Sequence, residues 1–276
     1  MIRHICFAFS ILIGAVNSAN AGCGPSPDAC EIDNGTYHIS LPENPQAAPV
    51  VMFLHGAGGS GATTIGNKNL VQSINARGYA VIAPSGSRRF GNGQGLMWAF
   101  RSDWPGRNER DFLLDVVADA ATRFGVSGDQ VLLGGFSGGA FMVYYLACEA
   151  PGTFAAYAPV SGGFWKPHPQ SCAGPVMMFH THGWTDRTVP LEGRPLRGGD
   201  FIQGDIFAGL EIWRAANGCS YDDPTGTSRT GEFLRRRWTD CAEASALEFA
   251  LFPGGHTVPD GWADMVLDWF EGLPGT

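Results

Sequence analysis

The sequence predicts an α/β protein with a mostly parallel sheet and helices on both faces. The first observation is that short apolar runs alternate with segments of helical periodicity along the chain. The second is that several runs are apolar throughout, as in PVVMFL at 49–54, which is typical of strands buried on both faces. In such a sheet, functional residues gather at the carboxyl ends of the strands.

The individual elements follow from the same patterns. Strands are expected at 36–41 (as an edge strand), 49–54, 79–83, 131–133, 154–160, 175–179 and 246–252. Helices are expected at 67–76, from a cap at Asn108 to residue 124, directly after Ser137, at 209–216 and at 262–270. Residues 85–107 hold many Gly and Arg residues and predict a long loop, a kind of segment that often forms a binding surface.

The first residues have the pattern of a secretory signal peptide. Residues 5–16 form an apolar run of 12, too short to span a bilayer, and Ala19-Asn20-Ala21 is an A-x-A cleavage site. We expect residues 1–21 to be removed after Ala21 and the mature protein to be secreted or periplasmic. A buried first strand, a membrane anchor and a lipoprotein modified at Cys23 are the alternatives, although Asn20 stands where a lipobox has Leu.

Composition excludes some classes of partner. A chain of 276 residues with 44% hydrophobic and 16% charged residues is ordinary for a globular protein, and we expect residues 22–276 to form a single domain. The formal net charge is -8 and there is no basic block, which argues against binding to nucleic acid or anionic lipid. No later stretch is apolar enough for a membrane helix, and the sequence does not reveal the oligomeric state.

The cysteines support export. Cys6 would leave with the signal peptide, and the six that remain are Cys23, Cys30, Cys148, Cys172, Cys219 and Cys241. An even number in an oxidising compartment favours disulfides over a metal site, since the chain has no C-x-x-C pair. Six cysteines allow about 15 pairings. Pairing of sequence neighbours (23–30, 148–172 and 219–241) is the simplest of them.

Gly135-Phe136-Ser137-Gly138-Gly139 is a G-x-S-x-G sequence between a predicted strand and a predicted helix. This context is typical of a nucleophilic serine on a sharp turn, where small neighbours let other segments approach closely. A serine hydroxyl also needs an adjacent base. His256 follows the strand at 246–252 and is the last histidine of the chain, so it is the candidate base. An ordinary Gly-rich turn and a surface histidine are the alternatives.

The base in turn needs a carboxylate that holds its tautomer. Asp186 follows the strand at 175–179 and lies between Ser137 and His256 in the chain, so it is the candidate acid. The alternative is an Asp that only caps a turn.

The segment His55-Gly56-Ala57-Gly58-Gly59 follows the first buried strand and suits close backbone approach. We expect the backbone N–H groups of Ala57 and Gly138 to form an oxyanion hole.

Four motifs together resemble a known group of enzymes. LHGAGG at 54–59, GFSGG at 135–139, HGWTDRTVP at 182–190 and GGHTVPDGW at 254–262 resemble the secreted esterases of the α/β-hydrolase superfamily grouped with polyhydroxybutyrate depolymerases and feruloyl esterases. The resemblance spans residues 36–272. It implies an α/β-hydrolase fold, a triad of Ser137, Asp186 and His256, and neither a metal nor another cofactor. The group often has Trp where this chain has Val258, so the pocket wall departs from its pattern.

The resemblance also implies a serine carboxylic-ester hydrolase that acts on a small or oligomeric ester. A polyhydroxybutyrate depolymerase-like activity is the first expectation, and a feruloyl or acetylxylan esterase is the alternative. A serine peptidase of related fold and a non-catalytic binding protein are further alternatives. Trp98 and Trp184 are the first candidates to line the substrate pocket, with core burial as the alternative. The other aromatic candidates are Phe100, Trp104, Phe164 and Trp165.

Overall fold

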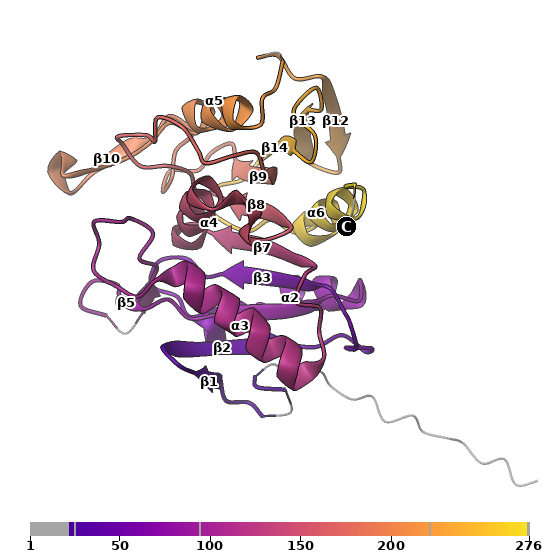
Figure 1. Cartoon of the computed structure of the whole chain (residues 1–276). Coiled ribbons are helices and arrows are strands. Elements are labelled where there is room, and N and C mark those ends of the chain that lie inside the picture. The colour runs from indigo at the N-terminus through magenta and orange to yellow at the C-terminus, as the bar shows by residue number, and fades with distance from the viewer. Residues whose placement is uncertain (1–21, 25, 94, 221, 275–276) are drawn as a thin grey trace, which may run out of the picture.

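The computed structural model describes residues 22–24, 26–93, 95–220 and 222–274, and the predicted signal peptide lies outside this range (Figure 1). Ten strands form one sheet in the order β1-β2-β4-β3-β7-β8-β9-β14-β13-β12. Their bounds are β1 Cys30–Ile32, β2 Gly35–Ser40, β3 Val50–Leu54, β4 Ala80–Pro84, β7 Val131–Phe136, β8 Ala156–Val160, β9 Met177–Gly183, β12 Gly226–Thr230, β13 Phe233–Trp238 and β14 Ala246–Phe252.

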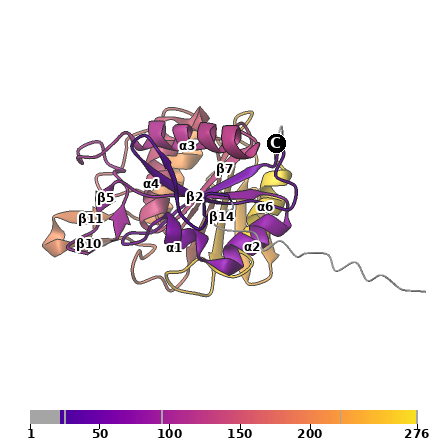
Figure 2. The ribbon, with the colours of Figure 1, turned by 90° about the horizontal axis from the view of Figure 1, so that it is seen from below.

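The other elements cover this sheet or extend from its ends. The helices are α1 Gly61–Ile65, α2 Lys68–Ala76, α3 Glu109–Phe124, α4 Gly138–Glu149, α5 Ile206–Ala216 and α6 Trp262–Glu271. Two small hairpins, β5 Arg88–Arg89 with β6 Leu96–Met97 and β10 Arg194–Leu196 with β11 Phe201–Gln203, lie outside the main sheet. Figures 1 and 2 show both hairpins at the same end of the molecule.

The central strands are parallel, as the apolar runs predict. β4, β3, β7, β8, β9 and β14 pair in parallel, and antiparallel strands complete both edges. The α/β-hydrolase fold class is thus confirmed. One detail is wrong: the segment 36–41 is not the edge, because β1 pairs with β2 on its outer side.

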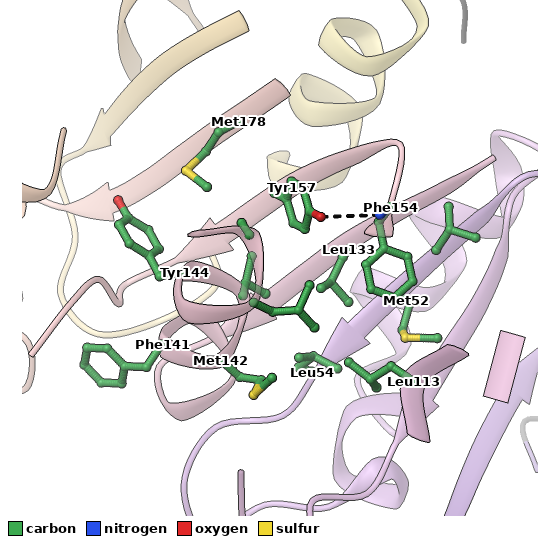
Figure 3. Close-up of a cluster of buried hydrophobic side chains, with 14 of the residues drawn as sticks. Met52, Leu54, Leu113, Leu133, Phe141, Met142, Tyr144, Phe154, Tyr157 and Met178 are labelled. Carbon is green, nitrogen blue, oxygen red and sulfur yellow. Dashed lines mark hydrogen bonds between the residues drawn. The ribbon is translucent and has the colours of Figure 1, made fainter. Parts of the chain in front are cut away.

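Two apolar cores lie on opposite faces of the sheet. In Figure 2, α3 and α4 lie on one side of the strands, and α2 and α6 lie on the other. Figure 3 shows part of the first core, in which Phe141, Met142 and Tyr144 of α4 form one cluster with Met52 and other strand residues. The second core joins α2 and α6 through residues such as Leu70, Ile74 and Phe270. Burial on both faces explains why the central strands are continuous apolar runs.

Strand pairing extends two elements beyond their apolar runs. β7 continues from the predicted end at 133 to Phe136, and β9 continues from 179 to Gly183. Glycine and histidine dominate these extensions, so hydrophobicity alone did not reveal them. They matter because they bring Ser137 and the 183–189 segment to the same edge of the sheet, where neighbouring parallel strands end.

All three disulfides join sequence neighbours, as predicted. The pairs are Cys23–Cys30, Cys148–Cys172 and Cys219–Cys241. The second ties the C-terminal end of α4 to the segment before β9. Within the described residues, no helix is both long enough and apolar enough to cross a bilayer.

Candidate active site

Ser137 lies on the sharp turn between β7 and α4. Its backbone has φ 54° and ψ -114°, a region that costs a non-glycine residue about 1–3 kcal/mol. The strand before it and the helix after it hold it there: its N–H donates to the Val160 carbonyl, and its own carbonyl accepts from Phe141. A strained serine between a strand and a helix is the geometry that a nucleophile elbow requires.

Two glycines of the motif are needed for steric reasons. A Cβ at Gly135 would lie 2.7 Å from the backbone of Gly139, and one at Gly139 would lie 2.3 Å from the Leu54 carbonyl oxygen. Both distances are shorter than real Cβ contacts, so a side chain at either position would push α4 away from β3 or β7. The spacing of G-x-S-x-G therefore follows from the packing of the helix start against two strands.

The predicted oxyanion donors are neighbours. A Cβ on Gly138 would lie 2.8 Å from the backbone nitrogen of Ala57, so the two segments are in contact. Neither the Ala57 N–H nor the Gly138 N–H donates to another described residue. Two unpaired donors beside Ser137 are what a developing oxyanion requires.

His55 and Trp98 hold the Ala57 segment in place. The Gly86 N–H donates to Nε2 of His55, so Nδ1 carries the proton and donates to the Gly56 carbonyl oxygen, 2.7 Å away. Burial lowers the pKa of His55 to about 4, which keeps the ring neutral. The Trp98 indole N–H donates to the His55 carbonyl oxygen. These contacts fix the backbone that presents the Ala57 N–H.

Asp186 and His256 form a hydrogen-bonded pair. Nδ1 of His256 lies 2.7 Å from Oδ2 of Asp186, and Oδ1 of Asp186 accepts from the N–H groups of Thr188 and Val189. Burial raises the pKa of the Asp186 carboxyl, but the hydrogen bonds from His256 and Val189 outweigh it and hold that pKa below its usual value. Asp186 is therefore an ionised carboxylate at neutral pH, suited to orient His256.

A second glycine contact brings these two loops together. A Cβ on Gly183 would lie 2.3 Å from the Gly255 carbonyl oxygen. The N–H of Trp184 donates to the Phe252 carbonyl, and the N–H of Thr185 donates to the Gly254 carbonyl. The turn after β9 is thus joined by backbone hydrogen bonds to the turn after β14, its parallel neighbour.

His256 lies beside the elbow. Its ring packs on Phe136, with the ring centroids 4.7 Å apart, and Phe136 directly precedes Ser137. Among the described residues the Ser137 hydroxyl makes no hydrogen bond to the imidazole. Free enzymes often have a longer contact here than the reacting complex has. The structure therefore brings Asp186 to His256, and His256 to the neighbourhood of Ser137.

A buried chain of hydrogen bonds lies behind Asp186 and was not predicted. Tyr144 is bonded to Nδ1 of His180, Nε2 of His180 is 3.0 Å from Nδ1 of His182, and Nε2 of His182 is 2.8 Å from the Val189 carbonyl oxygen. Burial lowers the pKa of both histidines. A carbonyl only accepts, so neutral rings leave one arrangement, in which each group donates toward Val189. No group of three His, Cys, Asp or Glu side chains in the described chain could hold a metal.

A cavity of about 420 Å³ opens beside Ser137 and Gly138. Much of its wall comes from the 85–107 loop and from the β10–β11 hairpin. These two segments are far apart in the sequence but lie at the same end of the molecule (Figures 1 and 2). The apolar side chains on its wall are Ala57, Phe90, Met97, Trp104, Phe141, Trp165, Val189, Leu196 and Phe201. The volume suits an aryl group or a short acyl chain.

The two tryptophans predicted to bind substrate do not line this cavity. Trp98 is fully buried beneath His55, so it has no exposed surface for a substrate. Trp184 is 64% exposed and is not among the residues that line the cavity. Of the other aromatic candidates, Trp104 and Trp165 line the cavity, and Phe100 and Phe164 are core residues. Aromatic residues in a sequence do not reveal which of them stay solvent-accessible.

Sequence reasoning also missed the β10–β11 hairpin and the arginines of the cavity. The hairpin has no apolar periodicity, and its only local signal is the Gly198-Gly199 turn. Arg88, Arg89, Arg194 and Arg197 all line the cavity. Their charges come together only through the tertiary fold.

Comparisons with known proteins show the family of this chain. The family described as Phospholipase/Carboxylesterase matches residues 34–196. Feruloyl esterase C of Emericella nidulans is 26% identical over 285 residues, covering 93% of this chain and 92% of that protein.

Solved structures show the same fold. An acetyl xylan esterase from Aspergillus awamori superposes with a TM-score of 0.64 at 18% identity, covering 92% of this chain and 99% of the other. A carboxylesterase from Mesorhizobium loti gives a TM-score of 0.56 at 18% identity, with 89% and 99% covered. The chain belongs to the phospholipase/carboxylesterase family of α/β-hydrolases, and it is a carboxylic ester hydrolase.

Proposed function

We propose that the chain hydrolyses carboxylic esters through an acyl-enzyme on Ser137. The observation that carries the proposal is the juxtaposition of the strained Ser137 turn with the free N–H groups of Ala57 and Gly138 and with the Asp186–His256 pair. This combination supplies a nucleophile, a base held in one tautomer and donors for an oxyanion.

The reaction follows from these roles. His256 accepts the Ser137 proton while Oγ attacks the ester carbonyl carbon, and the two N–H groups bind the resulting oxyanion. His256 then protonates the departing alcohol oxygen, which leaves the acyl group on Ser137. A water molecule loses its proton to His256 and attacks the acyl carbon, and Ser137 leaves with that proton. Asp186 stabilises the imidazolium in both halves.

Among ester classes, a feruloyl or acetylxylan-type substrate is favoured over polyhydroxybutyrate. The relative from Emericella nidulans is named for feruloyl ester hydrolysis and matches along nearly the whole chain. The aromatic wall of Trp104, Trp165 and Phe201 also suits an aryl acid. The relatives and solved structures described above are named as esterases, which favours an ester hydrolase over a peptidase or a non-catalytic binding protein.

The test compares wild type with Ser137→Ala on methyl ferulate, 4-nitrophenyl acetate and an oligomeric hydroxybutyrate. We expect wild type to cleave methyl ferulate with the highest kcat/KM of the three, and the variant to lose activity by about 10³-fold or more. Labelling by a fluorophosphonate should require Ser137. Undiminished turnover in the variant would reject Ser137 as nucleophile, and preference for the oligomer would restore the depolymerase alternative.

We also propose that the protein is exported after cleavage behind Ala21 and works in the periplasm or the medium. Three disulfides support an oxidising compartment. The N-terminal sequence of the protein recovered from periplasm and medium tests this, with Gly22 as the expected first residue.

A further inference from the structure

We propose that this site prefers esters that carry a carboxylate, which arginines around the cavity bind. The inference rests on the proposed esterase function and narrows its substrate class. Four arginines line the cavity beside Ser137, namely Arg88, Arg89, Arg194 and Arg197, and no described Asp or Glu does. The whole chain has a net charge of -8, so the charge of this cavity is opposite in sign to that of the protein.

These arginines differ from most others in lacking acidic partners. Six arginines elsewhere form ion pairs: Arg77, Arg101, Arg107, Arg123, Arg214 and Arg235. The four of the cavity form none with any described residue. Glu192 and Asp200 belong to the same segment as two of them, yet neither pairs with them nor lines the cavity. The positive charge is therefore not neutralised by the protein itself.

Most of their donors remain available. Arg88 donates one hydrogen bond, to the Pro105 carbonyl, and Arg194 donates one, from Nε to the Gln203 side chain. A guanidinium has five N–H donors, so several on each remain free for a ligand. The guanidinium groups of Arg89 and Arg197 donate to no described residue. A carboxylate accepts two parallel N–H bonds from one guanidinium, and such charge-assisted bonds are about twice as strong as those between neutral groups.

Two of the four arginines stack on aromatic rings of the cavity wall. The guanidinium carbon of Arg88 lies 4.6 Å from the centre of the Trp104 ring, and that of Arg197 lies 5.8 Å from the centre of Phe201. Trp104 and Phe201 themselves touch edge to face, 6.3 Å between centroids. Stacking restrains each guanidinium while its N–H edge stays free. The cavity thus offers an apolar wall to the body of a ligand and cations to its end.

The carboxylate can belong to either part of the ester. On the acyl side the substrate is a monoester of a dicarboxylic acid, and on the alcohol side it is an ester of an alcohol that bears an acid group, such as a uronic acid. Both present one carboxylate beyond the scissile bond. The shared chemistry is the carboxylate, and two pairs of substrates separate the two sources.

The acyl pair is mono-4-nitrophenyl suberate and the corresponding 4-nitrophenyl suberamate, which replaces the carboxylate by an amide. The alcohol pair is 4-acetoxyphenylacetic acid and 4-acetoxyphenylacetamide. The two esters of each pair are matched in size. The acyl pair shares its leaving group, and the leaving phenols of the alcohol pair differ only at the remote acid or amide group. We expect kcat/KM for the acid to exceed that for the amide by about tenfold in at least one pair. That ratio should fall several-fold in 0.5 M salt, because ions screen the attraction.

Variants locate the effect. The double variants Arg88→Gln/Arg89→Gln and Arg194→Gln/Arg197→Gln should each lower the acid-to-amide ratio. Arg229→Gln/Arg236→Gln is the matched control, since both are exposed arginines on the β12–β13 hairpin at the far edge of the sheet. It removes the same charge from the chain, so it reports any effect of net charge alone. A ratio that falls equally in the control would overturn the proposal.

A binding measurement separates this proposal from the esterase function. In Ser137→Ala protein, quenching of tryptophan fluorescence (Trp104 and Trp165 line the cavity) gives Kd for each ester without turnover. Tighter binding of the acids with no hydrolysis by wild type would reject the esterase function and keep the arginine site. Equal Kd and equal kcat/KM within both pairs would reject the carboxylate preference, whatever the catalytic rate.

Discussion

The imidazole of His182 donates a hydrogen bond from Nε2 to the carbonyl oxygen of Val189, 2.8 Å away. The N–H of Val189 in turn donates to Asp186 Oδ1 at 2.8 Å. His182 therefore holds the segment that supplies a donor to the proposed catalytic acid. Its Nε2 is also 3.6 Å from Asp186 Oδ2.

We expect His182→Leu to lower kcat by about tenfold or more with little change in KM, because the acid loop loses its anchor and the base loses its orientation. His182→Gln keeps an amide N–H near the position of Nε2 and should recover part of kcat. Steady-state kinetics on a short 4-nitrophenyl ester measure both.

Tyr144→Phe is the control for this series. It removes the far hydroxyl of the same buried chain and should lower the free energy of unfolding by about 1–2 kcal/mol without a fall in kcat. An unchanged kcat in His182→Leu would show that His182 is structural only.

Gly183→Ala should separate the acid from the base. The added Cβ would meet the Gly255 carbonyl oxygen at 2.3 Å, so the turn after β9 must move away from the turn that holds His256. A displacement of about 1 Å in a catalytic group costs about 10²-fold in rate. Gly152→Ala, where a Cβ meets nothing within 4 Å, is the matched control and should keep full activity. Equal rates in the two variants would contradict this account of the glycine.

Stability should fall as the pH drops from 6.5 toward 4. Burial lowers the pKa of His55 to about 4 and also lowers the pKa values of His180 and His182. Between those pH values the three histidines bind protons in the unfolded chain but stay neutral in the folded one. The free energy of unfolding therefore decreases as the solution is acidified. The stability is fully present above pH 6.5.

For His55 alone, the free energy of unfolding should decrease by about 2 kcal/mol between pH 7 and pH 5. Asp186 affects stability in a lower pH range. Because its pKa is lowered in the folded protein, its contribution to the free energy of unfolding is lost only as the pH falls below the ordinary value of 3.8. Urea unfolding at pH 7 and pH 5 measures the difference, and His55→Gln should reduce it. A free energy of unfolding that is flat over this interval would refute the prediction.

Removal of the Cys148–Cys172 disulfide should lower the free energy of unfolding more than removal of the Cys23–Cys30 disulfide. Cys148 and Cys172 are 24 residues apart, and Cys23 and Cys30 are 7 apart. A longer closed loop loses more chain entropy in the unfolded state when it is cross-linked. We expect the double alanine variant of the first pair to lose about 3 kcal/mol, and that of the second pair to lose less. Chemical unfolding of the two variants tests the order, which the opposite ranking would contradict.

Much of the fold follows from local patterns. The runs at 49–54 and 246–252 become β3 and β14 nearly residue for residue, because strands buried on both faces must be apolar throughout. The strand β12 and its pairing with β13 were not predicted, since most side chains of these two strands are exposed and polar and their pairing comes from backbone hydrogen bonds. A backbone ladder leaves no trace in hydrophobicity.

The sequence by itself determined the fold class and the order Ser137, Asp186, His256, because each depends on local spacing or on which residue follows a strand. It left about 15 disulfide pairings open, and the structure has the one between sequence neighbours. Only the tertiary structure decided which aromatic and charged side chains surround Ser137. Trp98 is buried in the core and Trp104 lines the cavity, although both belong to one loop. Burial and charge clustering depend on contacts between segments about 100 positions apart, such as Arg88 and Arg194, and no local pattern encodes those contacts.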